Sequence, residues 1–258
     1  MLTFNRLGWL RFGHDPALAV WAASALPHAI AAIRDPANAH WLRCGGTWFA
    51  GVNVLPNTPD GSVGTSGPLQ GRAIDEIRKL TGAVPEWDPA QISVIYPGYP
   101  RQEGETDTAF GYRQRRDAAH VDGLLRFGPE NRRKIGEPHG FVLGIPLTDS
   151  SEGASPLVVW EGSHHIIRSA LRDALNGHPP DAWCDIDVTE AYQSARRTCF
   201  DTCRRVTVHA RPGQAYLIHR HTLHGVSPWR EGATCDPEGR IIAYFRPVMQ
   251  SVVNWLAE

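Results

Sequence analysis

Short runs of β-branched and aromatic residues, separated by turn-forming residues, dominate the chain after residue 90 and constrain its fold most strongly. Six such runs cover residues 91–96, 141–147, 157–160, 205–210, 214–218 and 240–245. Glycine, proline, aspartate or serine punctuates them, as expected for strands joined by turns. Only residues 166–175 and 188–197 have a helical pattern between the runs. Strands and helices do not alternate regularly, so the sequence predicts a mainly β fold with flanking helices (α+β), an antiparallel sandwich or jelly roll.

The residues before these runs are predicted to form a helical and loop-rich lead-in. A helix is expected over residues 17–33, divided at Pro27, followed by a strand within 45–54, a polar loop over 57–67 and a helix over 74–80. No internal repeat and no linker separates two parts of the chain. We therefore expect one domain over residues 1–258, with the lead-in at 1–90 and a jelly-roll core at 91–250.

The composition limits the partners and the compartment. There are 26 basic and 27 acidic residues, for a formal net charge of -1, which argues against nucleic-acid binding. Five cysteines without framework spacing indicate a reduced, cytoplasmic protein. The apolar residues 17–33 are expected to be too short and too interrupted to span a membrane. No pattern in the sequence indicates an oligomeric state.

The triplet His120-Val121-Asp122 is the first candidate for a metal site. On a β-strand, residues two positions apart point to the same face, so the imidazole and the carboxylate would meet. His224, in Leu223-His224-Gly225, follows a strand-like run far downstream and could complete the set. Two histidines and one carboxylate that leave neighbouring positions open are typical of non-haem Fe(II) oxygenases.

Three more histidines lie close to His224 in the sequence and compete with it: His209, His219 and His221. For each of them we expect a surface position or a hydrogen-bonded place in the core.

The run over residues 240–246 begins and ends with arginine. With a period of two, Arg240, Ile242, Tyr244 and Arg246 share one face. A guanidinium group that enters an apolar barrel is costly unless it meets an anion, and a dicarboxylate suits its fork. Arg246, which Pro247 follows, could equally end in solvent.

In their order along the chain, these motifs resemble those of the phytanoyl-CoA hydroxylase family. The resemblance covers about residues 91 to 247 and includes His120-Val121-Asp122, residues 156–164, residues 223–228 and Arg240. It implies a double-stranded β-helix, a cupin-like jelly roll. It also implies Fe(II) held by His120, Asp122 and His224, with 2-oxoglutarate anchored by Arg240. The implied reaction uses O2, hydroxylates a small-molecule substrate and releases succinate and CO2.

The sequence departs from the family pattern at three places. Glu161 stands where the family usually has proline, and Ala154-Ser155 stands where Asn-Gly is common. An apparent insertion at residues 229–239 lengthens the gap between His224 and Arg240, which leaves Arg246 as an alternative anchor. Asp122 itself points away from the halogenating relatives, which lack this carboxylate.

Several further side chains could contribute to binding. Gln91, Tyr96 and Trp160 could line the cosubstrate pocket, and Ser227 could bind a carboxylate or simply form a turn. Arg126 and Arg246 are candidate substrate contacts. Arginines 113, 115, 116, 126, 132 and 133 flank the first ligand and could attract an anionic substrate, unless Asp117, Glu130 and Glu137 balance them.

Two other functions fit a jelly roll with this residue set. A hydrolase or isomerase could use the same three ligands with Zn²⁺ or Mn²⁺ to activate water, with no need for a buried arginine. A non-catalytic small-molecule-binding jelly roll would need no metal at all.

Overall fold

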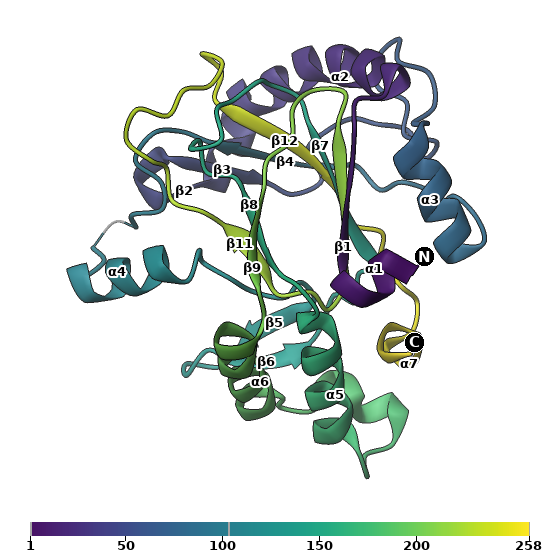
Figure 1. Ribbon diagram of the computed structural model, residues 1–258, viewed down its shortest axis with the longest axis vertical. Coiled ribbons are helices and arrows are strands. Elements are labelled where there is room, and N and C mark those ends of the chain that lie inside the picture. Colours follow the sequence, from purple (N-terminus) through teal and green to yellow (C-terminus); the bar gives the residue numbers. More distant parts are fainter. Residues whose placement is uncertain (1, 103, 258) are drawn as a thin grey trace.

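Two antiparallel β-sheets form the centre of the molecule (Figure 1). The computed structural model describes residues 2–102 and 104–257. The major sheet contains, in spatial order, β1 (Trp9–Phe12), β10 (Ala215–His219), β7 (Phe141–Pro146), β12 (Arg240–Phe245), β4 (Gln91–Ile95), β3 (Trp48–Gly51) and β2 (Leu42–Arg43). The minor sheet contains β11 (His224–Val226), β8 (Leu157–Trp160) and β9 (Arg205–Val208). A separate hairpin is formed by β5 (Leu124–Phe127) and β6 (Arg132–Ile135).

The order in which the chain visits the two sheets makes this fold a double-stranded β-helix. From β4 in the major sheet, the chain crosses to the minor sheet, where His120 forms a β-bridge with His224 of β11. It returns to the major sheet as β7 and then forms β8 and β9 of the minor sheet. After that it alternates between the sheets, with β10 in the major sheet, β11 in the minor sheet and β12 in the major sheet again. All the pairings are antiparallel. The predicted jelly roll is thus confirmed.

The lead-in contributes more sheet than its sequence suggested. The strand expected within residues 45–54 is present as β3, but β1 was not predicted, and both extend the major sheet at opposite edges. The helices are α1 (Leu2–Leu7), α2 (Pro16–Arg34), α3 (Arg72–Thr81), α4 (Asp107–Arg115), α5 (Ser163–Leu175), α6 (Thr189–Thr202) and α7 (Val252–Leu256). Short 3-10 helices span Pro36–Trp41, Cys44–Gly46 and Pro180–Asp185.

Helix α2 corrects the expectation that Pro27 divides this segment. The helix is continuous through Pro27, although proline removes one helical hydrogen bond. Its buried residues Leu18, Trp21 and Ala25 recur at helical spacing, and the Trp21 indole donates to the Gly61 carbonyl at 2.7 Å. Packing on the core therefore outweighs the lost bond. Against expectation, the length and composition of α2, with a mean hydropathy of 1.5, would suffice for a membrane span, as they would for a core helix.

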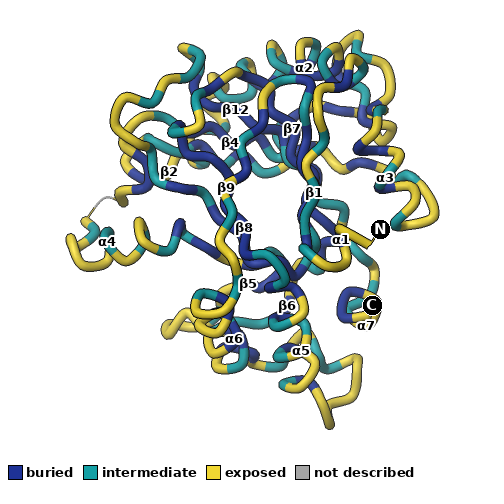
Figure 2. Tube along the Cα trace, viewed as in Figure 1, coloured by how far each residue is buried: buried dark blue, intermediate teal, exposed yellow. Residues whose placement is uncertain are grey.

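Buried side chains form two main clusters, one on each side of the sheets (Figure 2). The first lies between the major sheet and helices α2 and α3. The second joins β8 to helices α5, α6 and α7 and to the β5–β6 hairpin. Helix α4, which the sequence did not predict, carries no buried residue among those described. The insertion at 229–239 folds back, with β-bridges from Trp229 to Ala154 and from Cys235 to Ser150.

Candidate metal centre and its cavity

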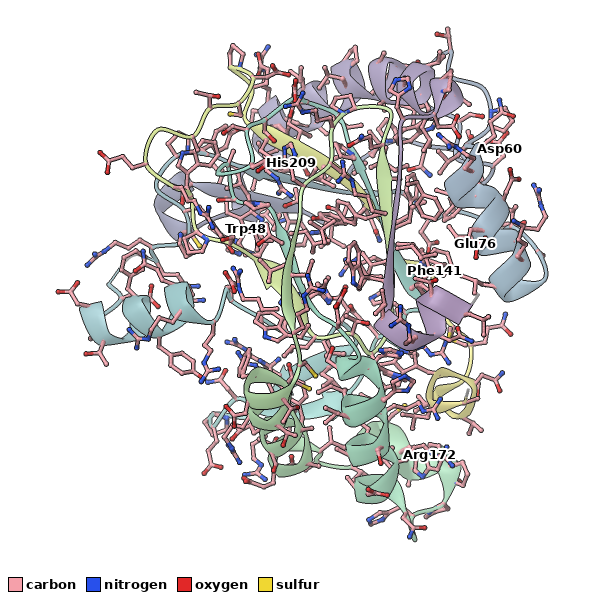
Figure 3. The ribbon with its side chains drawn as sticks, in the orientation of Figure 1. Trp48, Asp60, Glu76, Phe141, Arg172 and His209 are labelled. Atoms are coloured by element: carbon pink, nitrogen blue, oxygen red, sulfur yellow. The ribbon has the colours of Figure 1, made fainter. Side chains whose placement is uncertain are left out.

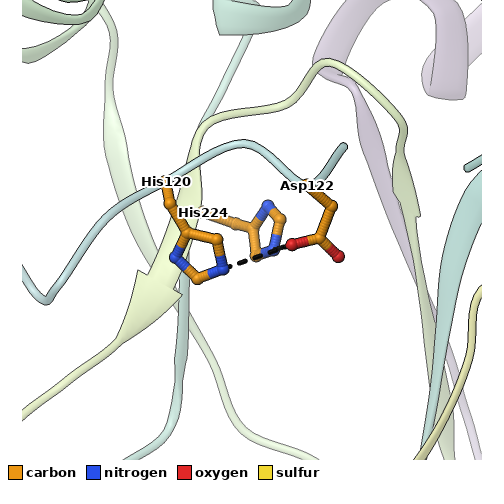
Figure 4. A group of neighbouring side chains, drawn as sticks. All are labelled: His120, Asp122 and His224. Carbon is orange, nitrogen blue, oxygen red and sulfur yellow. Dashed lines mark ion pairs between the residues drawn. The ribbon is translucent and has the colours of Figure 1, made fainter. Parts of the chain in front are cut away.

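His120, Asp122 and His224 converge at one end of the space between the sheets (Figure 4). One ligand atom from each lies within 4.8 Å of the others. Asp122 Oδ1 is 3.3 Å from His120 Nε2 and 3.8 Å from His224 Nε2. The two imidazole centroids are 4.8 Å apart. Two nitrogens and one carboxylate oxygen thus face a common point, as a facial metal site requires.

The local backbone at the first two ligands differs from the expected strand. His120 forms an isolated bridge with His224, with backbone N–H···O distances of 2.8 and 3.0 Å in the two directions. Asp122 then lies in a turn with Gly123, whose φ is +90°. Glycine adopts this φ without strain, and it ends the pairing at this point. The period-two argument was therefore wrong about the backbone, although the side chains do meet.

The hydrogen bonds of both histidines favour the tautomer that a metal needs. His224 Nδ1 is 2.9 Å from the Thr222 carbonyl, and His120 Nδ1 is 3.1 Å from the Ala118 carbonyl. A carbonyl oxygen can only accept, so each Nδ1 carries the proton and each Nε2 keeps its lone pair. Metal-binding histidines are commonly oriented by such a bond from the other ring nitrogen.

Charges around the site keep its groups in the binding form. Burial raises the pKa of Asp122, but the polar contacts with His120 and His224 and the charge of Arg246 outweigh it and hold the pKa well below its usual range. Burial lowers the pKa of His224 to about 4, against the opposing charge of Asp122. At neutral pH the site therefore presents a carboxylate and a neutral imidazole.

A cavity of about 410 Å³ opens beside the three side chains. Gln91, Ser93 and Tyr244 line it from the major sheet, and Leu157 and Val226 from the minor sheet. Its remaining lining residues are Trp41, Arg43, Trp48, Ala50, Val52, Glu137, Val142, Gly225 and Arg246. This volume is typical of binding sites for small ligands, whose volumes are roughly 300–1,000 Å³.

The two arginines of β12 and its end have different surroundings. Arg246 lines the cavity, and its Nη1 is 3.5 Å from Asp122 Oδ2. Arg240 is only 4% exposed, and its Nη1 has no hydrogen-bond partner among the described residues. It lies against Tyr216, whose hydroxyl donates to that of Tyr244 at 2.8 Å. Arg240 is thus a buried cation with unused donor capacity, close to a tyrosine that lines the cavity.

Other residues singled out in the sequence lie elsewhere. Gln91 lines the cavity, but Tyr96, Trp160 and Ser227 do not. Tyr96 packs against the cluster under the major sheet, and Trp160 stacks edge-on with Phe200 at 5.2 Å. The backbone of Ser227 bonds to the carbonyl of Pro156 at 2.9 Å.

Two of the basic residues beside the first ligand, Arg113 and Arg132, are paired with acids. Arg126, on the β5–β6 hairpin, is exposed and outside the cavity. Arg132 pairs with Asp187, and Arg113 lies 2.9 Å from Glu105. These partners lie mostly outside the set expected from the sequence, because the pairing is set by folding rather than by proximity along the chain.

The lead-in supplies cavity residues that the sequence did not reveal. Trp48 (labelled in Figure 3), Ala50 and Val52 alternate along β3 and its end, and all three line the cavity, whereas Phe49 is in the core. Arg43 of β2 lies directly opposite Trp48 in the register. The sequence signal for this wall was the alternation within residues 45–54. It indicated a strand, but it did not indicate that one face of the strand would border the cavity.

No family model matches the chain, and no curated protein sequence matches it. Among solved structures it is similar to the non-haem alpha-ketoglutarate-dependent carbocyclase SnoK of nogalamycin biosynthesis, with 11% identity over 95% of this chain and 82% of that one, at a TM-score of 0.48. AviO1 from Streptomyces viridochromogenes Tue57 matches with 13% identity over 97% and 94%, at 0.47. EctD from S. alaskensis, crystallised with 2-oxoglutarate and 5-hydroxyectoine, matches with 14% identity over 95% and 74%, at 0.43. At these values, the function has to be inferred from the chain's own residues.

Proposed function

We propose that this protein is an Fe(II)- and 2-oxoglutarate-dependent dioxygenase of the phytanoyl-CoA hydroxylase-like kind, which hydroxylates a small molecule. The convergence of His120 Nε2, Asp122 Oδ1 and His224 Nε2 at the mouth of a jelly-roll cavity carries this proposal. Two imidazoles and one carboxylate that leave open positions are the donor set of non-haem Fe(II) oxygenases. Bound Fe(II) and 2-oxoglutarate would supply the oxidation: substrate R–H, O2 and 2-oxoglutarate give R–OH, succinate and CO2.

Arg240 is proposed as the anchor for the distal carboxylate of 2-oxoglutarate. Its buried Nη1 lacks a partner among the described residues, and such a charge is costly to bury unless an anion meets it. A carboxylate can accept two parallel hydrogen bonds from a guanidinium group. Arg246, the alternative, is already next to Asp122. Gln91 and Tyr244, which line the cavity, would contact the cosubstrate or the substrate.

The chain's own groups would perform three tasks in this reaction. Nδ1–H of each histidine, fixed by a backbone carbonyl, would hold its Nε2 towards the metal. Asp122 would offset part of the metal's charge. The apolar side chains of Val142, Leu157 and Val226 would exclude water from the reacting C–H bond.

We also propose that the substrate is small, carries a flat ring and is anionic. Trp48 is held by an indole hydrogen bond to Ser93 Oγ at 3.1 Å, and the small side chain of Ala50 leaves space beside it. Arg43 lies 5.8 Å from the Trp41 ring centroid and, among the described residues, donates to the backbone carbonyls of His40 and Leu42, contacts that do not neutralise its charge. Flat rings stack on indoles, and a carboxylate would pair with the guanidinium. Binding of phenylacetate, phenylacetamide and cyclohexylacetate, followed by NMR, tests ring and charge separately. Equal affinity for all three probes would contradict this substrate class.

The central experiment is an anaerobic titration of the iron-loaded protein with 2-oxoglutarate. We expect a visible metal-to-ligand band that saturates, followed by oxygen uptake and succinate release when air is admitted. A hydrolase or isomerase that uses Zn²⁺ or Mn²⁺ would give no such band. A non-catalytic binding protein would retain its ligand after the metal is removed.

A further inference from the structure

The two oxygens of the Asp122 carboxylate have different neighbours. Oδ1 faces both imidazoles, at 3.3 Å from His120 Nε2 and 3.8 Å from His224 Nε2. Oδ2 faces Arg246, whose Nη1 is 3.5 Å away. In Figure 4 one carboxylate oxygen points between the two rings and the other points away from them. The carboxylate therefore has a defined rotation before any metal binds.

The backbone of Arg246 is itself held in place. His139 Nδ1 donates to the Arg246 carbonyl at 2.9 Å, and His139 forms a β-bridge with Val248. The Trp255 indole donates in turn to the His139 carbonyl at 3.0 Å. Arg246 is 20% and Asp122 12% exposed at the side chain, so solvent weakens their contact less than it would at the surface. The guanidinium thus approaches Oδ2 from a fixed strand end.

We propose that Arg246 is a positioning residue that keeps Asp122 a one-oxygen ligand. A metal-binding carboxylate can coordinate through one oxygen or through both. With Oδ2 paired to Arg246, only Oδ1 is free to bind, and a six-coordinate metal keeps three open positions. A carboxylate bound through both oxygens would take one of the three, and the chelating cosubstrate together with O2 needs all of them. This role rests on the proposed metal site, and it replaces the expectation that Arg246 binds substrate or 2-oxoglutarate.

Mn²⁺ binding, without turnover, tests the proposal. The enhancement of water-proton relaxation by protein-bound Mn²⁺ reports how many water molecules the metal carries. We expect three in the wild type and two in Arg246→Gln, so that the enhancement falls by about a third, while Arg246→Lys, which keeps a charged donor, restores it.

Arg126→Gln is the matched control, because Arg126 is an exposed arginine outside the cavity. Thermal unfolding of each variant confirms that the comparison is made on folded protein, and Arg246→Met, which also lacks a charged donor, covers the case in which Arg246→Gln does not fold. An enhancement in Arg246→Gln or Arg246→Met equal to that of Arg126→Gln would overturn the positioning role. Failure of the wild type to bind Mn²⁺ would instead refute the metal site itself, so the two failures are distinguishable.

Discussion

Histidines cluster in two parts of this molecule, and the surroundings of the two clusters are opposite. His120 and His224 share a carboxylate, border a cavity and direct Nε2 to one point. His164, His219 and His221 pack against one another instead, with ring centroids 4.7 Å apart for the first two and 5.5 Å for the last two. Among the described residues, only the first cluster brings three possible ligand atoms within 4.8 Å.

Burial and, to a smaller extent, nearby positive charges keep the second cluster neutral. Arg168, Arg220 and the neighbouring His165 lie close to it, and burial is the main cause that lowers its pKa values. The pKa of His164 falls to about 4 and that of His219 to about 2. A histidine becomes a metal ligand when a carboxylate and an open space accompany it. Without them, it is a neutral packing residue.

Acidification should destabilise the protein through the second cluster, and this is the largest effect we expect. Burial depresses the folded-state pKa of His164 and His219 below the ordinary 6.5, so the unfolded chain takes up protons that the folded chain does not. Their contribution to the free energy of unfolding is complete above about pH 6.5 and is lost as the pH falls, towards about 4 for His164 and about 2 for His219. We expect a loss on the order of 5 kcal/mol between pH 7 and pH 4, measured by urea unfolding of metal-free protein.

The variant His164→Gln isolates this contribution. It cannot titrate, so its free energy of unfolding should depend less steeply on pH between 6.5 and 4 than that of the wild type. Parallel curves for the two proteins would show that the pKa of His164 is the same in the folded and unfolded chains, against the depressed value expected from its burial.

Metal binding should depend on the first cluster and not on the second. Replacing a direct ligand in His224→Ala or Asp122→Ala should weaken Co²⁺ binding by more than about 100-fold, since even groups that only orient a ligand contribute 10- to 100-fold. His164→Gln should leave the affinity within about 2-fold. Calorimetric titration measures both, and a comparable loss in His164→Gln would mean that the metal binds at the second cluster.

The sequence predicted the first cluster from two structural expectations, of which one was right and one was wrong. The strands over residues 157–160 and 240–245 appear with the expected bounds, because short β-rich runs between turns report the sheet directly. The meeting of His120 with Asp122 was derived from a strand that is in fact a single bridge and a turn. Only the pairing of His120 with His224, 104 positions later, creates the site, and a local pattern cannot report such a contact.

The cavity wall shows what the sequence could not supply. Trp48 comes from residues 45–54, whose alternation indicates a strand, whereas Arg43 of β2 precedes that segment. Which side of β3 would border the metal depends on its place in the major sheet between β4 and β2. Likewise, α4 has a weakly amphipathic, mostly polar sequence with no buried residue described, and such a helix leaves little periodic signal.

Arg240 and Arg246 provide a second contrast, for which we expect changes in binding of intermediate size. Arg240→Met should raise the dissociation constant of 2-oxoglutarate about 30-fold, since removing one partner of a buried ion pair costs about 2 kcal/mol or more. It should leave Mn²⁺ affinity within about 2-fold. Arg246→Gln should instead lower the number of water molecules on bound Mn²⁺ and change cosubstrate affinity at constant metal saturation by less than about 3-fold. The metal-to-ligand band of the iron complex measures the cosubstrate affinities, and water-proton relaxation reports on bound Mn²⁺; a larger loss of cosubstrate affinity in Arg246→Gln than in Arg240→Met would make Arg246 the anchor.

The smallest effect we expect comes from His221, at the end of the second cluster that faces Trp255. Its side chain is fully buried, neither ring nitrogen has a hydrogen-bond partner among the described residues, and its ring meets Trp255 edge-on at 4.4 Å. An unsatisfied buried polar group costs free energy that an apolar side chain does not. His221→Leu should therefore raise the free energy of unfolding at pH 7 by about 1 kcal/mol. His164→Leu, which loses the hydrogen bond to the Asn5 carbonyl at 2.9 Å, should lower it by about as much. Destabilisation of both variants to the same extent would show that His221 also has a polar partner, and that packing alone does not keep it neutral.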